Sequence, residues 1–89
     1  MAHMKLGLFI RPTGHHIASW RHPNAHDDAN VNFDRFIEMA QTAERGFFDM
    51  LFSADTHTAW TTTDSALNRQ HYSAWLEPYT LLAALAPHT

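Results

Sequence analysis

Hydrophobic residues along this chain gather in short runs that are separated by long polar stretches. Residues 5–10 (KLGLFI) form one apolar run, which ends at Arg11-Pro12 because proline cannot donate to a sheet ladder. Residues 47–54 (FFDMLFSA) form another run, which ends at Asp55. Apolar runs of this length predict two buried strands of a parallel sheet.

The segment between these runs has the pattern of an amphipathic helix. Apolar side chains recur at steps of three and four residues, the period of one helical face, at Phe33, Phe36, Ile37, Ala40 and Ala43. Asn32 can cap the start of this helix, and Asp34 lies favourably near its positive end. Gly46 suits a left-handed stop after Arg45.

A second helix is predicted from Pro78, which fits a first helical turn, to Ala86, because Pro87 breaks the pattern. Strand, crossover helix, strand and helix are the elements of a parallel α/β fold, whose crossover is nearly always right-handed. No third strand follows to cover the sheet edge, so we expect a chain truncated after the second helix. The open edge also predicts homo-oligomers.

Two segments are too long to be plain connections. Residues 13–32 are rich in His, Trp and Asn, and residues 56–75 are polar and Thr-rich. Connections in such folds usually have about two to six residues, so the second segment is expected to be a functional loop or lid. Ligands of parallel α/β folds bind at the carboxyl ends of the strands, where both segments start.

Composition excludes several classes of protein. The net charge is −3 and the Lys and Arg residues are scattered, which argues against a nucleic-acid partner. The chain has no cysteine, and no run approaches the roughly 20 apolar residues of a membrane span, so we expect a cytoplasmic protein without a membrane partner. Residues 1–3, which precede Met4, are expected to be vector-derived, leaving 4–89 as an N-terminal domain fragment.

The loop of residues 14–23 concentrates candidate chemistry. His15, His16, His22 and the nearby His26 raise the possibility of a metal site, but Pro23-Asn24 interrupts the four-residue spacing and no zincin-type motif is present. Alternatively, these rings hydrogen-bond or exchange protons around an aromatic ligand, with Trp20 as a flat wall. Ordinary exposed loop histidines are the third interpretation.

Carboxylates and large apolar residues outside this loop are interpreted by their position. Asp55 follows the second strand, where it could bind a ligand or simply cap a loop. Asp49 and Glu44 lie near the opposite end of the elements and are interpreted as structural. Four side chains are expected in the core: Met39, Phe47, Phe48 and Met50. GxGxxG, GxxxxGK[ST] and GxSxG motifs are absent from the sequence.

Three blocks in this order, GHHIASWRHP, AERGFFDMLFSAD and LEPYTLLAALAPHT, make the chain resemble the flavin-dependent monooxygenases related to bacterial luciferase. The subgroup it resembles most is the nitrilotriacetate and dibenzothiophene-sulfone monooxygenase type. The resemblance implies an eight-stranded (β/α)8 TIM barrel, of which this chain would be the first two βα units. It also implies reduced FMN, supplied by a separate flavin reductase, O₂ and a small organic substrate.

The resemblance assigns roles to individual residues. Asp55 matches the family's Asp beside the flavin, and Gly14-His15 matches the family's GH in the first loop. His15 and the adjacent His16 are therefore the candidate catalytic residues. Trp20 and His22 match a segment near the substrate pocket. Two further hypotheses stay open: a small βαβα interaction module that uses its open sheet edge, and a His-rich metal-binding module without catalytic activity.

Overall fold

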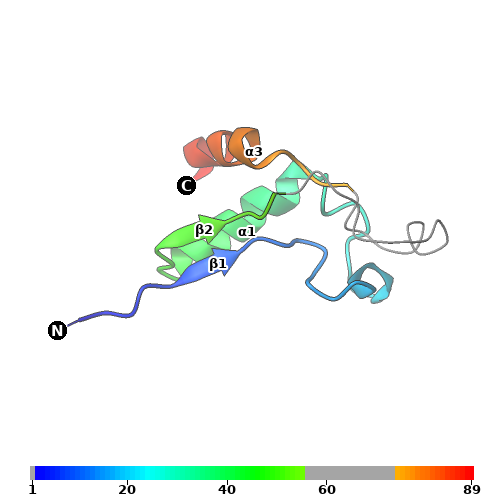
Figure 1. Ribbon diagram of the computed structural model, residues 1–89, viewed down its shortest axis with the longest axis horizontal. Coiled ribbons are helices and arrows are strands. Elements are labelled where there is room, and N and C mark those ends of the chain that lie inside the picture. The colour runs from blue at the N-terminus through cyan, green and yellow to red at the C-terminus, as the bar shows by residue number, and fades with distance from the viewer. Residues whose placement is uncertain (1, 56–73) are drawn as a thin grey trace.

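The computed structural model describes residues 2–55 and 74–89 and confirms the order of elements predicted from the sequence (Figure 1). Strand β1 (Gly7–Phe9) is followed by a 3-10 turn, η1 (Ser19–Arg21), and by helix α1 (Phe33–Arg45). Strand β2 (Met50–Phe52), helix α3 (Pro78–Leu85) and a second 3-10 turn, η2 (Ala86–His88), complete the described part. The predicted lid at residues 56–75 falls almost entirely outside the described residues.

The two strands form a parallel pair, as the βαβ pattern predicts. Leu8 lies beside Leu51 and Phe9 beside Phe52, and the amide of Ile10 continues the ladder by donating to the Phe52 carbonyl at 2.8 Å. Asp49 closes the other end of the pair, because its carboxylate accepts a hydrogen bond from the Leu6 amide at 2.8 Å. The structural role predicted for Asp49 is confirmed.

Helix α1 begins and ends at the predicted residues, but the left-handed residue after it is Phe47 and not Gly46. The Asn32 side chain accepts a hydrogen bond from the Asp34 amide at 3.1 Å, which is an N-cap. At the other end, Gly46 has an ordinary φ of −82°, and Phe47 takes the left-handed conformation with φ 58°. Phe47 donates to the Glu44 carbonyl and Phe48 to the Ala43 carbonyl, both at 3.0 Å, which is the pair of bonds of a Schellman motif.

Helix α3 starts at Pro78, as expected, and Glu77 caps it. The Glu77 carboxylate accepts hydrogen bonds from the amides of Tyr79 and Thr80, at 2.9 and 2.8 Å. The Thr80 amide contributes most to lowering the pKa of the Glu77 carboxyl below its ordinary value, followed by the Tyr79 amide and the Thr80 hydroxyl. Pro87 does not end the chain's helical character, because it lies inside η2.

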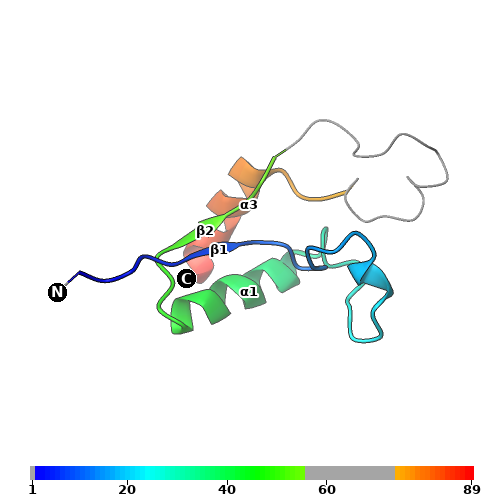
Figure 2. The ribbon, with the colours of Figure 1, turned by 60° about the horizontal axis from the view of Figure 1, so that its bottom comes forward.

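Both helices pack against the same face of the two-stranded sheet (Figure 2). Alternation along the strands places Leu8, Ile10 and Leu51 on that face. The core joins Ile10 with buried side chains of α1 and α3, namely Phe36, Ala40, Leu81 and Leu85, and Met39 and Leu51 pack at its margin. The core position predicted for Met39 is therefore confirmed.

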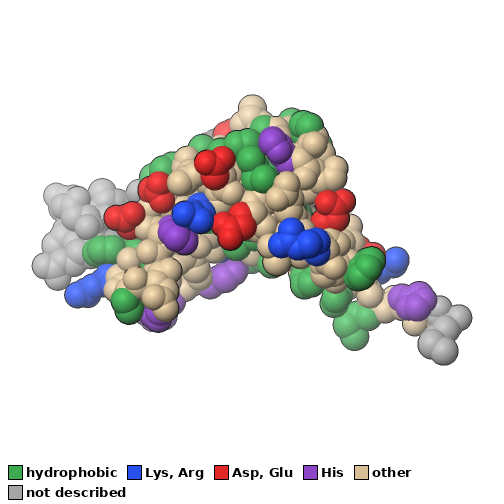
Figure 3. Space-filling model, turned by 180° about the vertical axis from the view of Figure 1, so that it is seen from behind, with side chains coloured by type: hydrophobic (Ala, Val, Ile, Leu, Met, Phe, Trp, Pro, Cys, Tyr) green, Lys and Arg blue, Asp and Glu red, His purple; other side chains and the backbone are tan. Residues whose placement is uncertain are grey.

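The other face of the sheet is open, which corrects part of the core prediction. Met50 and Phe52 are 57% and 50% exposed, and Phe47 and Phe48 at the turn before β2 are 88% and 39% exposed. Hydrophobic side chains accordingly gather at the lower right of Figure 3, beside the N-terminal arm. Apolar composition predicted burial on both faces, but the described helices cover only one. Within the described ranges, no helix is long and apolar enough to cross a membrane.

Candidate functional site

The parallel pairing brings the carboxyl ends of β1 and β2 to one edge of the sheet, where both candidate segments begin (Figure 1). The chain leaves β1 at Ile10 and enters the His-rich loop, and it leaves β2 through Ser53 and Ala54 to reach Asp55. The sequence placed the loop and Asp55 at a shared edge, and this part of the prediction is confirmed. Asp55 is exposed there and makes no hydrogen bond or ion pair within residues 2–55 and 74–89.

An aromatic cluster covers the open face of the sheet at this edge. The Phe9 ring packs edge to face against Phe52, with ring centroids 5.1 Å apart, and against His15, at 5.0 Å. The Arg11 guanidinium lies 5.1 Å from the Phe9 ring centroid. His15 is therefore the loop histidine that folds back onto the strands, and it does so by contact with an apolar ring.

Arg11 also connects the two halves of the described chain. Its guanidinium lies 5.2 Å from the Trp75 ring centroid, so the same cation contacts one aromatic ring from each of the two described ranges. A small cavity of about 20 Å³ lies beneath this contact, lined by the ends of both strands, including Ser53 and Ala54, and by Trp75. The sequence analysis missed Arg11, although its place directly after the first strand was a signal for it.

The loop itself is held by local hydrogen bonds. Gly14 has φ 108° and donates its amide to the Arg11 carbonyl at 2.9 Å, which turns the chain sharply after the strand. His16 Nδ1 accepts a hydrogen bond from the Ala18 amide at 3.0 Å, and His22 Nδ1 accepts one from the Asn24 amide at 3.1 Å. In a neutral imidazole that accepts at Nδ1, the proton is on Nε2, so both rings are hydrogen-bond donors at that atom.

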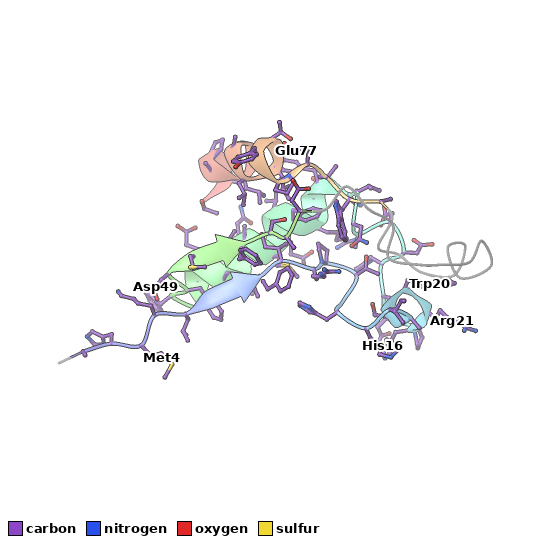
Figure 4. The ribbon with its side chains drawn as sticks, in the orientation of Figure 1. Met4, His16, Trp20, Arg21, Asp49 and Glu77 are labelled. Atoms are coloured by element: carbon purple, nitrogen blue, oxygen red, sulfur yellow. The ribbon has the colours of Figure 1, made fainter. Side chains whose placement is uncertain are left out.

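The predicted site residues divide into two groups. His15 lies against the strands, whereas His16 and Trp20, labelled in Figure 4 with Arg21, lie on the outer part of the loop. The Arg21 guanidinium is 5.9 Å from the Trp20 ring centroid. In the part of the chain that the structure describes, no three His, Cys, Asp or Glu side chains are placed to hold a metal ion together.

An open groove of about 680 Å³ runs along the inner side of this loop. Its lining extends from Arg11 to Ala25 and includes Thr13, His16, Arg21 and His22. Thr13 is 5% exposed, and its Oγ1 is buried without a hydrogen-bond partner in residues 2–55 and 74–89. Leaving a buried hydroxyl unpaired costs about 1–3 kcal/mol.

Comparisons with known proteins show what this chain is similar to. The family model described as luciferase-like monooxygenase matches residues 13–89. N-acetyl-S-(2-succino)cysteine monooxygenase of Bacillus subtilis (strain 168) is 51% identical over 97% of this chain and 18% of its own length. One of the subunits of pristinamycin IIA synthase from Streptomyces pristinaespiralis is 43% identical over 93% of this chain and 19% of its own length.

Nitrilotriacetate monooxygenase component A of Aminobacter aminovorans is 36% identical over 93% of this chain and 20% of its own length. The chain thus spans about a fifth of the length of the curated relatives it matches. The family match covers most of the chain and includes both the loop and Asp55. The resemblance seen in the three sequence blocks is confirmed, and the chain belongs to the luciferase-like monooxygenase family.

Proposed function

We propose that the chain is the N-terminal part of a two-component flavin-dependent monooxygenase, which uses reduced FMN and O₂ to oxidise a small organic substrate. The observation that carries this proposal is the shared edge of β1 and β2, which has an open aromatic face. The match to the luciferase-like monooxygenase family includes the His-rich loop and Asp55 at this edge. In the complete protein, these strands would be the first two of a (β/α)8 barrel, and the open face would line its interior.

The residues at this edge fit a flavin. A flavin ring needs an apolar wall and a few polar groups near its nitrogen and oxygen atoms, and Phe9 and Phe52 provide such a wall. Ser53 and Ala54 leave little bulk where the chain passes from β2 to Asp55. When bound, reduced FMN supplies the electrons that activate O₂, and the protein positions the reactants and excludes water.

The family resemblance suggests individual roles, and these positions are compatible with them. Asp55, exposed at the carboxyl end of β2, would hold the flavin through hydrogen bonds to its carboxylate. His15, packed on Phe9, would donate a hydrogen bond at the reacting end of the cofactor, with His16 as the alternative donor from the next position. Trp20 and His22 would contact the substrate from the outer part of the loop.

Anaerobic titration of reduced FMN into the complete protein that contains this segment tests the cofactor assignment. Asp55→Asn should weaken reduced FMN binding about tenfold, the effect expected for loss of one charge-assisted hydrogen bond. Glu44→Gln removes a carboxylate at the far end of α1 and serves as the matched control, with unchanged binding. A wild-type protein that fails to bind reduced FMN would overturn the proposal, and equal effects of both variants would overturn the role of Asp55.

The remaining partners are part of the same proposal. A separate flavin reductase would deliver the cofactor, and the name component A of the nitrilotriacetate relative supports a two-component organisation. A cytoplasmic location would give access to that reductase. A homo-oligomer would cover apolar surface that does not line the barrel interior, such as Phe47 in the turn before β2. Light scattering on the complete protein should therefore give a mass above that of one chain, and a monomer would contradict this part.

A further inference from the structure

Arg11 lies directly after the ladder between β1 and β2, at the edge proposed for the flavin. Its guanidinium carbon lies over the Phe9 ring, 5.1 Å from the ring centroid, and 5.2 Å from the Trp75 ring centroid. Phe9 and Phe52 are the two rings of the proposed flavin wall. We propose that Arg11 is a positioning residue of the flavin site, because contact with its guanidinium holds the Phe9 ring in place. This inference rests on the proposed function and adds a residue to its site.

The backbone on both sides of Arg11 is held by hydrogen bonds. One residue before it, the Ile10 amide donates to the Phe52 carbonyl at 2.8 Å, so the chain is still part of the ladder. After it, the Gly14 amide donates to the Arg11 carbonyl at 2.9 Å and closes a turn. Residues two apart in an extended chain share a face of the sheet, so this backbone directs the Arg11 side chain to the open face on which Phe9 lies.

The Phe9 ring needs such support because it lies on the face of the sheet that the described helices leave open. Its ring contacts with Phe52 and His15, at 5.1 and 5.0 Å between centroids, are both edge to face. A cation is attracted to the electron-rich face of an aromatic ring, so the guanidinium favours an orientation in which Phe9 turns its face toward Arg11. Phe52 packs against the Phe9 ring in that orientation, and the two rings together form the wall.

Trp75 in turn restrains the Arg11 side chain. Tryptophan is the aromatic ring that attracts a cation most strongly, and a planar guanidinium also stacks on aromatic faces. Trp75 belongs to the segment that leads into α3, so its contact with Arg11 joins the end of β1 to the second described range. A long, flexible side chain that is ordered in this way loses its freedom before the flavin binds. The ordering cost is then not charged against cofactor affinity, which is the advantage of a preorganised site.

Anaerobic titration of reduced FMN into variants of the complete protein tests this inference. Arg11→Met keeps most of the side-chain length but removes the cation, and it should bind reduced FMN about tenfold more weakly than wild type. Arg11→Lys keeps a cation for the Phe9 ring and should stay within about threefold of wild type. Arg45→Gln is the matched control with unchanged binding, because Arg45 is exposed on α1 and donates to Thr42 Oγ1 at 3.0 Å. Urea unfolding checks each variant, and Arg11→Gln replaces Arg11→Met if that variant does not fold.

A double-mutant cycle with Phe9→Leu shows whether Arg11 acts through the Phe9 ring. If it does, the double variant should bind reduced FMN no more weakly than Phe9→Leu alone, because the cation then has no ring to hold. The inference is overturned if Arg11→Met binds as tightly as wild type, or if Arg11→Lys loses as much affinity as Arg11→Met. It is also overturned if the two losses multiply, which is the result of a direct contact between Arg11 and the anionic cofactor.

The wild-type titration separates this inference from the proposed function. A wild-type protein that does not bind reduced FMN overturns both. A wild-type protein that binds reduced FMN, together with any of the three contrary results for the variants, overturns the role of Arg11 alone.

Discussion

Substituting Gly46 by alanine tests which residue after α1 is left-handed: Phe47, as in the structure, or Gly46, as the sequence predicts. The sequence pattern predicts a left-handed Gly46, and there an alanine would cost about 1–2 kcal/mol. In the structure Gly46 has φ −82°, a conformation that alanine adopts without strain. A Cβ at this position would have its nearest contacts at 3.5 Å, which is an ordinary van der Waals distance.

We therefore expect Gly46→Ala to stabilise the protein by about 0.4–1 kcal/mol, because alanine restricts the unfolded chain more than glycine does. Phe47→Gly places glycine at the residue that is left-handed, with φ 58°. Relief of the backbone strain is offset by the greater freedom of glycine in the unfolded chain, so the net effect should lie between zero and about 1 kcal/mol of stabilisation. The Phe47 side chain is 88% exposed and adds little to this balance.

Urea unfolding of the complete wild-type protein and of the Gly46→Ala and Phe47→Gly variants measures these changes in the free energy of unfolding. Gly14→Ala is the internal control, because φ is 108° and the added Cβ would lie 2.9 Å from Ser19 Cβ and Oγ. That variant should lose at least about 1–2 kcal/mol. If Gly46→Ala also destabilises the protein by about 1 kcal/mol or more, the left-handed residue is Gly46, and the Schellman assignment to Phe47 is wrong.

Two further predictions concern α3. Leu81→Ala should lower the free energy of unfolding by about 2–5 kcal/mol, because Leu81 is 3% exposed in the shared core, whereas Leu82→Ala, at 36% exposure, should change it by less than about 1 kcal/mol. Glu77 has a pKa lowered mainly by the Thr80 amide, so its stabilising effect is present above the ordinary carboxyl pKa and is lost as pH falls through the lowered value. Thermal unfolding of Glu77→Gln between about pH 7 and about pH 3 should show a smaller loss of stability on acidification than wild type, and parallel curves would contradict this.

Local signals predicted the elements of this fold well, because each signal involves neighbouring residues. Asn32 caps α1 and Pro78 opens α3 through interactions within a few residues of each. The left-handed residue after α1 was predicted one position too early, at Gly46, because glycine is the usual residue in this conformation. The hydrogen bonds that close the helix end instead make Phe47 left-handed. The predicted burial of Met50 was wrong for a different reason, because it depends on what covers the second face of the sheet.

The candidate site was also predictable where it depends on the order of elements, and not where it depends on turn conformation or on distant residues. The shared edge of the loop and Asp55 follows from parallel pairing, which the order of elements indicates. The hydrogen bonds within the loop could not be predicted from the sequence. His16 and His22 accept them from backbone amides whose direction depends on the turn conformation. Arg11 was missed because its significance comes from Trp75, a residue 64 positions later that only the fold brings near.

The alternation of the strands connects stability to the proposed function. Leu51 faces the helices and packs at the margin of the core, whereas its neighbour Phe52 faces the open side and contacts Phe9. Because side chains alternate strictly between the two faces, a substitution at Leu51 acts on packing and one at Phe52 acts on the candidate ligand wall. The apolar character of both faces, which suggests simple burial from sequence alone, therefore has two separate physical causes: a helical layer on one side and an aromatic wall beside Arg11 and His15 on the other.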